Sequence, residues 1–249
     1  MSYTAVPDIN IEKINITSYA FDSKGGAKTG GQNGNGISIG IDTDAGGIVT
    51  ASYSCVALTP AEHNYMNWLG AYLNSKTRFI NVPFFTDWYG PFPTVGGRGA
   101  PFLAPETFSD GTSFSDGTLF REAAVWGSFP GDQRVSAGQV VINIFGAARE
   151  ILWSDWFSVR HPTKGWRIYR NWESSARAAV TQDIDGITYT GEQYTLSLDR
   201  GLREAVTAGT RIEFARPRCV MKFAEDFTLP SEASGYFESR PRLEFTEAF

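Results

Sequence analysis

The chain has 249 residues and a formal net charge of −5, with 42% hydrophobic and 20% charged residues. This length and composition are typical of one large or two modest globular domains, and they exclude an intrinsically disordered chain. The mildly acidic balance argues against nucleic-acid binding as the main task. The apolar runs are far shorter than the roughly 20 residues that cross a bilayer.

The N-terminal third has the pattern of β-strands around a glycine-rich segment. Spaced isoleucines predict a strand over 9–16, and the alternating residues 37–41 and 49–55, separated by a turn, predict a β-hairpin. Residues 25–36 contain no apolar side chain larger than alanine. We therefore expect this segment to be a mobile loop until something orders it.

One helix is well marked. Thr59 is suited to the N-cap, Pro60 to the first helical position, and Glu62 to the completion of a capping box. Apolar residues then recur at helical spacing and predict one buried face, made of Tyr65, Trp68, Leu69 and Tyr72. The helix is expected to end near Asn74.

The rest of the chain is predicted to be strands with turns between them. After a strand over 78–85, residues 91–122 are rich in Gly, Pro, Ser and Phe, and the string FSDGT occurs at 108–112 and again at 114–118. Because Asp-Gly favours turns, we expect an extended arm here. Further strands are predicted over 139–145, 151–159, 166–172, 187–190, 194–198, 211–215, 220–223 and 243–249, with a short helix over 202–206.

No residue pattern indicates catalysis, a cofactor or a metal. The string GISIG at 36–40 matches a nucleophile elbow, but Ser38 lies within an alternating strand rather than between a strand and a helix. The glycine-rich segment lacks the glycine that directly precedes the lysine of a phosphate loop. Two histidines and two cysteines at unrelated positions give no ligand spacing. We expect Cys55 and Cys219 to be buried thiols in a protein made in a reducing cytoplasm.

Tryptophans and arginines are interleaved in the second half of the chain. Exposed tryptophans can stack on sugar rings or anchor protein interfaces, so Trp153, Trp156 and Trp172 are candidate glycan or partner contacts. The alternative is that these rings belong to a hydrophobic core.

Four segments carry a resemblance to a known family. They are LTPAEHNYMNWLGAYLNSKTRFINVPFFTD at 58–87, FSDGTSFSDGTLF at 108–120, WFSVRHPTKGWRIYRN at 156–171, and YTLSLDRGLREAVTAGTRIEFARPRCVMKF at 194–223. Together with the order of elements, they resemble the distal tail proteins, which are tail-tip ring components of long-tailed siphophages. The resemblance covers most of the chain.

The resemblance implies a mainly β fold: a tail-tube-like β-sandwich or barrel with one flanking α-helix, plus an inserted or appended small β-barrel or sandwich domain. In this reading, residues 1–90 and about 216–249 form the ring-forming domain. Residues 91–122 form the arm, and residues 123–215 form the inserted domain.

The function that this family implies is structural. Its members form a ring, usually a homohexamer, that joins the tail tube to the hub and the receptor-binding parts and continues the DNA channel. The implied partners are further copies of the chain, the tail tube protein, and the hub and tape-measure proteins, with DNA only in passage and a host glycan as a further option. The implied location is the virion tail, after synthesis in the bacterial host cytoplasm. A tail-tube or tail-completion subunit is a variant of the same reading.

Within this reading, the glycine-rich segment is the candidate inter-subunit loop, through Gly25, Gly26, Lys28, Gly30, Gly31, Asn33 and Gly36. Its small residues would allow a neighbour's backbone to approach closely, and we expect it to become ordered only on assembly. Two other function classes stay open. One is a carbohydrate-binding β-sandwich module for host glycans. The other is a secreted polysaccharide-cleaving enzyme, against which the absence of a recognisable signal peptide counts.

Overall fold

The computed structural model describes residues 3, 5–25, 27–32, 34–36, 38–42, 47–87, 90–103, 123–153, 155–184, 187–230 and 238–249. The chain divides into two compact units. The first, which we call the sheet unit, contains Met1–Pro83, Pro162–Trp166 and Arg218–Phe249, and the second, the barrel unit, contains Phe84–His161 and Arg167–Pro217. The sequence places the corresponding boundaries near 90 and 216 and does not assign 162–166 to the first unit.

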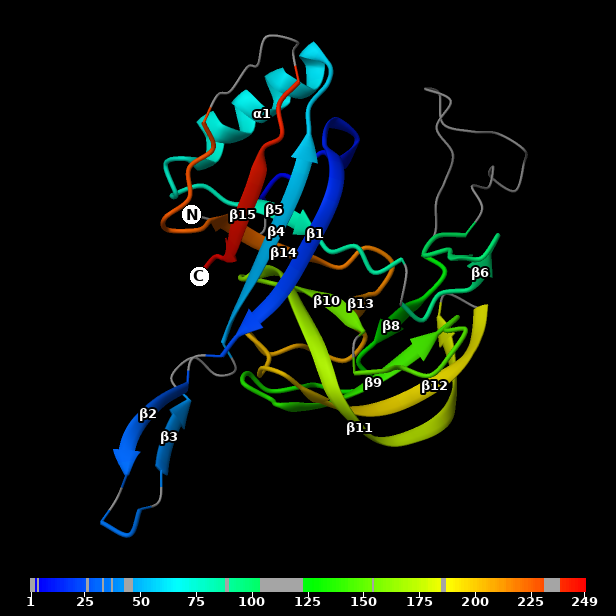
Figure 1. Cartoon of the computed structure of the whole chain (residues 1–249). Coiled ribbons are helices and arrows are strands. Elements are labelled where there is room, and N and C mark those ends of the chain that lie inside the picture. Colours follow the sequence, from blue (N-terminus) through cyan, green and yellow to red (C-terminus); the bar gives the residue numbers. More distant parts are fainter. Residues whose placement is uncertain are drawn as a thin grey trace, which may run out of the picture. The chain divides into compact units, whose positions relative to one another are not determined.

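The sheet unit is built on five antiparallel strands in the order β1-β4-β15-β14-β5 (Figure 1). They are β1 (Asn15–Lys24), β4 (Ile48–Val56), β5 (Ile80–Pro83), β14 (Arg218–Phe223) and β15 (Arg242–Glu247). Burial alternates along β4, where Val49, Ala51, Tyr53 and Cys55 are buried. The period-two pattern in the sequence therefore predicts the buried face of β4 correctly.

The predicted first strand is wrong over most of its length. A 3-10 turn, η1 (Ile11–Lys13), interrupts residues 9–16, and β1 begins only at Asn15. The side chain of Asn10 accepts a hydrogen bond from the backbone N–H of Glu12, which stabilises the turn. Ile9 and Ile14 are buried, so the isoleucine spacing reports burial here and not a strand.

The helix α1 (Pro60–Leu73) lies beside the sheet (Figure 1) and has the predicted capping box. The hydroxyl of Thr59 accepts from the N–H of Glu62, and the carboxylate of Glu62 accepts from the N–H of Thr59. The predicted buried face is only partly correct, because the buried residues are Met66, Leu69, Gly70 and Leu73. Tyr65, Trp68 and Tyr72 stack on one another instead, with ring centroids 5.3 and 5.2 Å apart, and Trp68 is 42% exposed.

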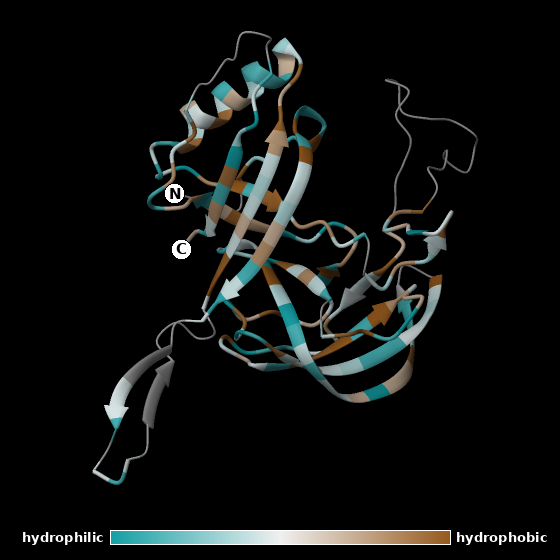
Figure 2. Cartoon of the chain, viewed as in Figure 1, coloured by the Kyte–Doolittle hydropathy of each residue, from teal (hydrophilic) through white to brown (hydrophobic). Residues whose placement is uncertain are grey.

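The barrel unit contains a closed barrel in the order β10-β11-β12-β9-β8-β13. Its strands are β8 (Trp126–Ser128), β9 (Gln139–Phe145), β10 (Trp156–His161), β11 (Gly165–Ile184), β12 (Ile187–Leu198) and β13 (Arg211–Glu213), and a two-residue ladder joins β6 (Thr94–Val95) to β7 (Arg98–Gly99). Apolar side chains fill the interior, among them Ile142, Ile144, Phe157, Leu196 and Ile212. Figure 2 shows the apolar character of β9.

Several predictions in the barrel unit need correction. The strand predicted over 151–159 begins only at Trp156, as β10. Residues 202–206 do not form a helix. Leu202 and Val206 are buried, and Val206 forms an isolated β-bridge with Gln133. The strands predicted over 187–190 and 194–198 are one strand, β12, and the strand predicted over 166–172 is the start of the 20-residue β11. The segment 104–122, with both copies of FSDGT, lies outside the described residues.

The expected fold class is confirmed. The described chain is mainly β, with one α-helix and a closed small barrel between β5 and β14. The barrel is inserted because β5 and β14 pair directly with each other, from Arg218↔Pro83 to Met221↔Ile80.

Candidate assembly surfaces

The glycine-rich segment forms a two-stranded arm. β1 and β4 pair as far as Lys24↔Ile48, and the residues between them fold into β2 (Ala27–Gln32) and β3 (Ser38–Asp42), which pair antiparallel (Figure 1). This corrects two predictions. Residues 25–36 are not a loop throughout, and residues 37–41 pair with the preceding strand and not with β4, which lies between β1 and β15.

The base of the arm requires a glycine. Gly47 has φ +89°, and a Cβ at this position would overlap the backbone carbonyl of Lys24. Only glycine accepts this φ without strain and also leaves room for so close an approach. At Gly31 and Gly36 the φ angles are +85° and +76°, but a Cβ added at either position would meet no other atom within 4 Å. A side chain is therefore excluded sterically at the base of the arm, whereas the far end of the arm has room for one.

Most of the predicted contact residues on the arm are exposed. Gly25, Gly30, Gly31 and Gly36 are exposed, and the backbone of Lys28 pairs with Ile41. Gly26 and Asn33 lie outside the described residues. In the described part of the chain, β2 and β3 pair only with each other. Each strand therefore keeps an edge that a further strand could pair with.

The three candidate tryptophans differ in exposure. Trp153 and Trp172 are 70% and 59% exposed, but Trp156 is only 5% exposed. The ring of Trp156 packs against Phe84, and the guanidinium of Arg170 lies 4.9 Å from its centroid. Trp156 is thus a core residue and is withdrawn as a glycan or partner contact, because a buried ring cannot stack on a ligand.

Trp153 is presented by a braced turn. The carboxylate of Asp155, which is 1% exposed, accepts bonds of 2.8 and 2.7 Å from the two terminal nitrogens of Arg149 and another of 2.8 Å from the N–H of Leu152. A bidentate pair of this kind fixes the geometry of the turn. Trp172 lies on β11, where its indole N–H donates to the carbonyl of Leu198, so only its ring face is available to a ligand.

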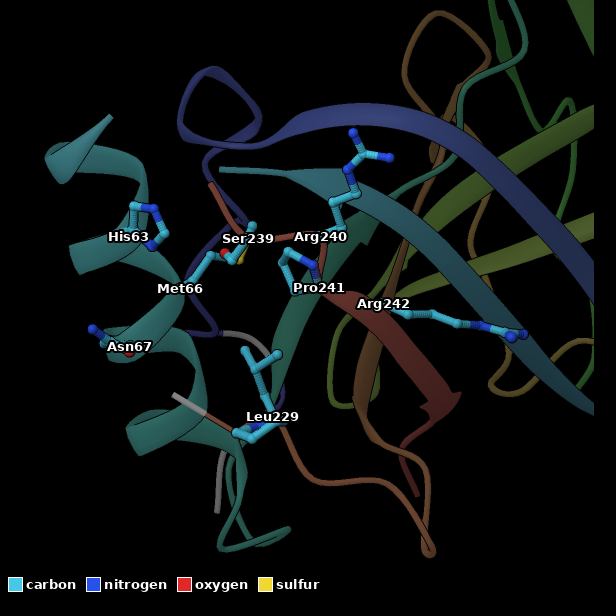
Figure 3. A pocket seen from close by; sticks show the side chains of 9 residues that line it. His63, Met66, Asn67, Leu229, Ser239, Arg240, Pro241 and Arg242 are labelled. Atoms are coloured by element: carbon cyan, nitrogen blue, oxygen red, sulfur yellow. The ribbon is translucent and has the colours of Figure 1, made fainter. Parts of the chain in front are cut away.

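A pocket of about 200 Å³ lies between α1 and the segment that leads into β15 (Figure 3). Met66 and Leu229 contribute its apolar lining, and Figure 3 shows the side chains of Arg240 and Arg242 directed away from them. These arginines pair with Glu238 and Glu244 at 2.7 and 3.1 Å. The pocket is smaller than typical sites for drug-sized ligands, and none of the residues predicted from the sequence lines it.

Cys55 and Cys219 are buried thiols, as expected, and no disulfide joins them. They lie on β4 and β14, which β15 separates. Burial raises the pKa of the Cys55 thiol to about 12. Among the described residues, no group of three or more His, Cys, Asp or Glu side chains is arranged to hold a metal ion. None of the helices described is long and apolar enough to cross a membrane.

The structure adds one element that the sequence patterns did not reveal as a candidate. The outer part of β11 is exposed along residues 173–179, where Glu173 and Arg177 stand among serines and alanines and no apolar face is marked. The sequence predicts only the start of this strand, residues 166–172, and the pairing with β12 extends it to Ile184. Comparison with protein-family models finds no match for this chain, and no curated protein matches it significantly.

Proposed function

We propose that this protein is a structural subunit of a bacteriophage tail tip, where copies of the sheet unit assemble into a ring between the tail tube and the hub. In this role the chain contacts further copies of itself, the tail tube protein, and the hub and tape-measure proteins, and DNA passes through the ring. The barrel unit is the part inserted into the ring-forming chain.

The observation that carries this proposal is the β2–β3 arm. It continues the hairpin of β1 and β4 past Lys24↔Ile48, its described side chains are exposed, and no third strand of the described chain supports it. A two-stranded ribbon is marginally stable in water by itself. Such an arm gains stability when a neighbouring subunit supplies a further strand or an apolar surface.

The composition of the arm suits contact with a neighbour's backbone. Glycines at positions 30, 31, 34 and 36 carry no side chains that would keep another chain away. Figure 2 shows the coloured residues of the arm in pale or teal, so this part of the arm offers little apolar surface. Its partner contacts are therefore expected to be backbone hydrogen bonds, as in β-augmentation.

The experiment removes the arm without disturbing the sheet. Residues 25–47 are replaced by Asn-Gly, which closes a two-residue hairpin between Lys24 and Ile48, the last pair of the β1–β4 ladder. We expect the wild-type chain to form rings, in light-scattering mass and in negative-stain images, and the armless variant to form none. The free energy of unfolding should change by no more than about 1 kcal/mol, because the described residues of 25–36 are exposed and the closing pair Lys24↔Ile48 is kept.

A matched control changes another exposed turn. Gly96 in the β6–β7 turn has φ +59° and open space around it, so Gly96→Asn should fold and leave the rings intact. Rings that persist without the arm would contradict the proposal. So would a wild-type chain that forms no ring, either alone or with the tail tube protein.

Carbohydrate binding by the barrel unit is the second candidate, favoured by the exposure of Trp153 and Trp172. Exposed rings of this kind stack on sugars or anchor protein partners. A glycan array with wild-type protein, Trp153→Ala and Trp172→Ala tests it. Loss of a specific glycan signal in one variant supports glycan binding. An array on which the wild-type protein gives no signal contradicts this second candidate function.

A further inference from the structure

The two edges of β11 are paired over different parts of the strand. One edge pairs with β12 from Asn171 to Ile184, and the other faces β10 in the barrel. β10 has six residues and is joined to β11 through residues 162–164, so it reaches back along β11 only to about Arg170. Within the described residues, neither a strand nor an isolated bridge pairs with the rest of that edge.

The unpaired part includes a regular stretch at 176–184. Irregularities interrupt the β11–β12 ladder before Glu173 and before Ala176, but from Ala176 to Ile184 every residue pairs in register with β12. Residues 176–179 are exposed. Of the features that protect natural edge strands from pairing, the stretch has no proline, lysine or bulge, and its charged residues are one Arg and one Asp. It is therefore a template for another strand.

The stretch is self-complementary about Val180. When a second copy lies antiparallel with Val180 opposite Val180, Ala179 faces Thr181 and Ala178 faces Gln182. The two ionisable residues of the stretch, Arg177 and Asp183, are three positions from Val180 on either side, so they face each other. Opposite charges directly across an antiparallel pair are favourable, and like charges do not meet in this register.

Both charged groups keep bonding capacity for a second copy. The terminal nitrogens of Arg177 bond Glu150 and Glu192, and its side chain is 43% exposed. The Nε–H group remains as a donor. One oxygen of Asp183 accepts from the hydroxyl of Thr188, and the other oxygen can accept from a second chain. The existing bonds also hold each group in place before pairing.

We propose that residues 176–184 of β11 form a two-fold docking surface whose occupant is the same edge of a second copy of this chain. Pairing would continue the hydrogen-bonded sheet from one barrel into the other. Because each chain has one such edge, this contact closes at two copies. It is independent of the proposed ring, since it uses the barrel unit and not the arm.

The first test is cross-linking of the full-length chain through single added cysteines. Val180→Cys places a thiol on the two-fold axis, next to its counterpart. Ala178→Cys is the matched control on the same face of the strand, where the counterpart lies four residues along the pair, too far for a disulfide. The native cysteines are buried and should not compete. We expect mild oxidation to link most of the Val180→Cys chains and at most a tenth as many Ala178→Cys chains.

The second test is mass. Val180→Lys puts two like charges on the axis and should weaken the association of two copies about tenfold or more, with an unchanged circular dichroism spectrum. Equal cross-linking at positions 178 and 180, no cross-linking at either, or an unchanged mass for a folded Val180→Lys variant would each overturn the proposal. An edge that instead accepts an extended segment of another protein would appear as an absence of self cross-linking.

These outcomes separate the edge contact from the ring. If the edge contact forms, Val180→Cys should still cross-link in the armless chain, whether or not the rings are lost. Rings that survive Val180→Lys while the cross-link at position 180 is absent would overturn the edge contact alone.

Discussion

Two antiparallel ribbons of this chain, the outer part of β11–β12 and the arm β2–β3, differ in what holds them in place. The outer part of β11–β12 pairs in register from Ala176↔Thr195 to Ile184↔Ile187, and β9 supports the other edge of β12 from Gly191 to Ser197. The arm β2–β3 has an irregularity between Thr29 and Gln32 and no third strand in the described chain. Pairing on both edges of β12 and side-chain bonds hold the first ribbon, whereas the arm depends on the pairing of its own two strands.

Side chains explain the difference. Gln182, near the end of β11, accepts bonds of 3.3 Å from the side chains of Ser128 and Asn143, and Asn143 accepts a bond of 3.0 Å from Gln193. These bonds anchor the β11–β12 ribbon to β8 and β9. Glycines in the arm can form no such anchors and lose more backbone entropy on ordering. We infer that the first ribbon has the same shape in the isolated chain, and that the arm reaches a single shape with a partner.

The largest expected effect is on the free energy of unfolding. It compares a substitution at the base of the arm with one at its far end. Gly47→Val introduces a Cβ that collides with the Lys24 carbonyl at φ +89°, so we expect a loss of about 3 kcal/mol or more in the free energy of unfolding. Gly31→Val is also at positive φ but in open space, and the strain can be relieved by local opening. Its global cost should stay below about 1 kcal/mol. Equal costs in urea unfolding would refute the contrast.

A smaller effect is expected from the anchor of the β11–β12 ribbon. Asn143 is 4% exposed, and Asn143→Leu removes its bonds with Gln182 and Gln193 while it keeps the size of the side chain. Because the partners lose bonds in a partly buried place, we expect destabilisation by about 1–3 kcal/mol. Gln139→Ala is the control, since its bond to Ser175 is long, at 3.5 Å, and exposed. If both variants melt at the wild-type temperature, the network does not anchor the ribbon.

Alkaline pH should weaken both units through different groups. Burial raises the pKa of Cys55, on β4, from 9.0 to about 12, and burial together with the bond to Glu192 raises the pKa of Tyr194, on β12, from 10.0 to about 12. In each case the unfolded chain loses its proton at lower pH than the folded chain. The stabilisation is therefore complete below the unfolded pKa and is lost as the pH rises toward 12.

The slope is about 1.4 kcal/mol per pH unit for each group. Urea unfolding midpoints measured from pH 8 to 11 should fall less steeply above about pH 9 in Cys55→Ala, and above about pH 10 in Tyr194→Phe. Slopes that match the wild-type chain in both variants would show that these groups do not couple folding to pH.

Local patterns in the sequence predict several elements well. The capping box at Thr59 and Glu62 locates the start of α1, because it depends on residues three apart, and the alternation over 49–55 identifies the buried face of β4. The candidate sites are predicted less completely. The glycine-rich segment is predicted to be a loop, and its strands are missed, because glycine carries no side-chain pattern that marks a strand. Trp156 is misplaced, because composition does not report burial.

The sequence by itself determined the class of the fold and the single long helix, since both follow from propensities and periods within a few residues. The tertiary structure alone decided which strands pair. It joined β5 to β14 across the inserted barrel, placed β4 between β1 and β15, and left the outer edge of β11 without a strand partner in the described chain. The physical reason is that pairing depends on hydrogen bonds between residues far apart in the chain, and no local pattern specifies the partner.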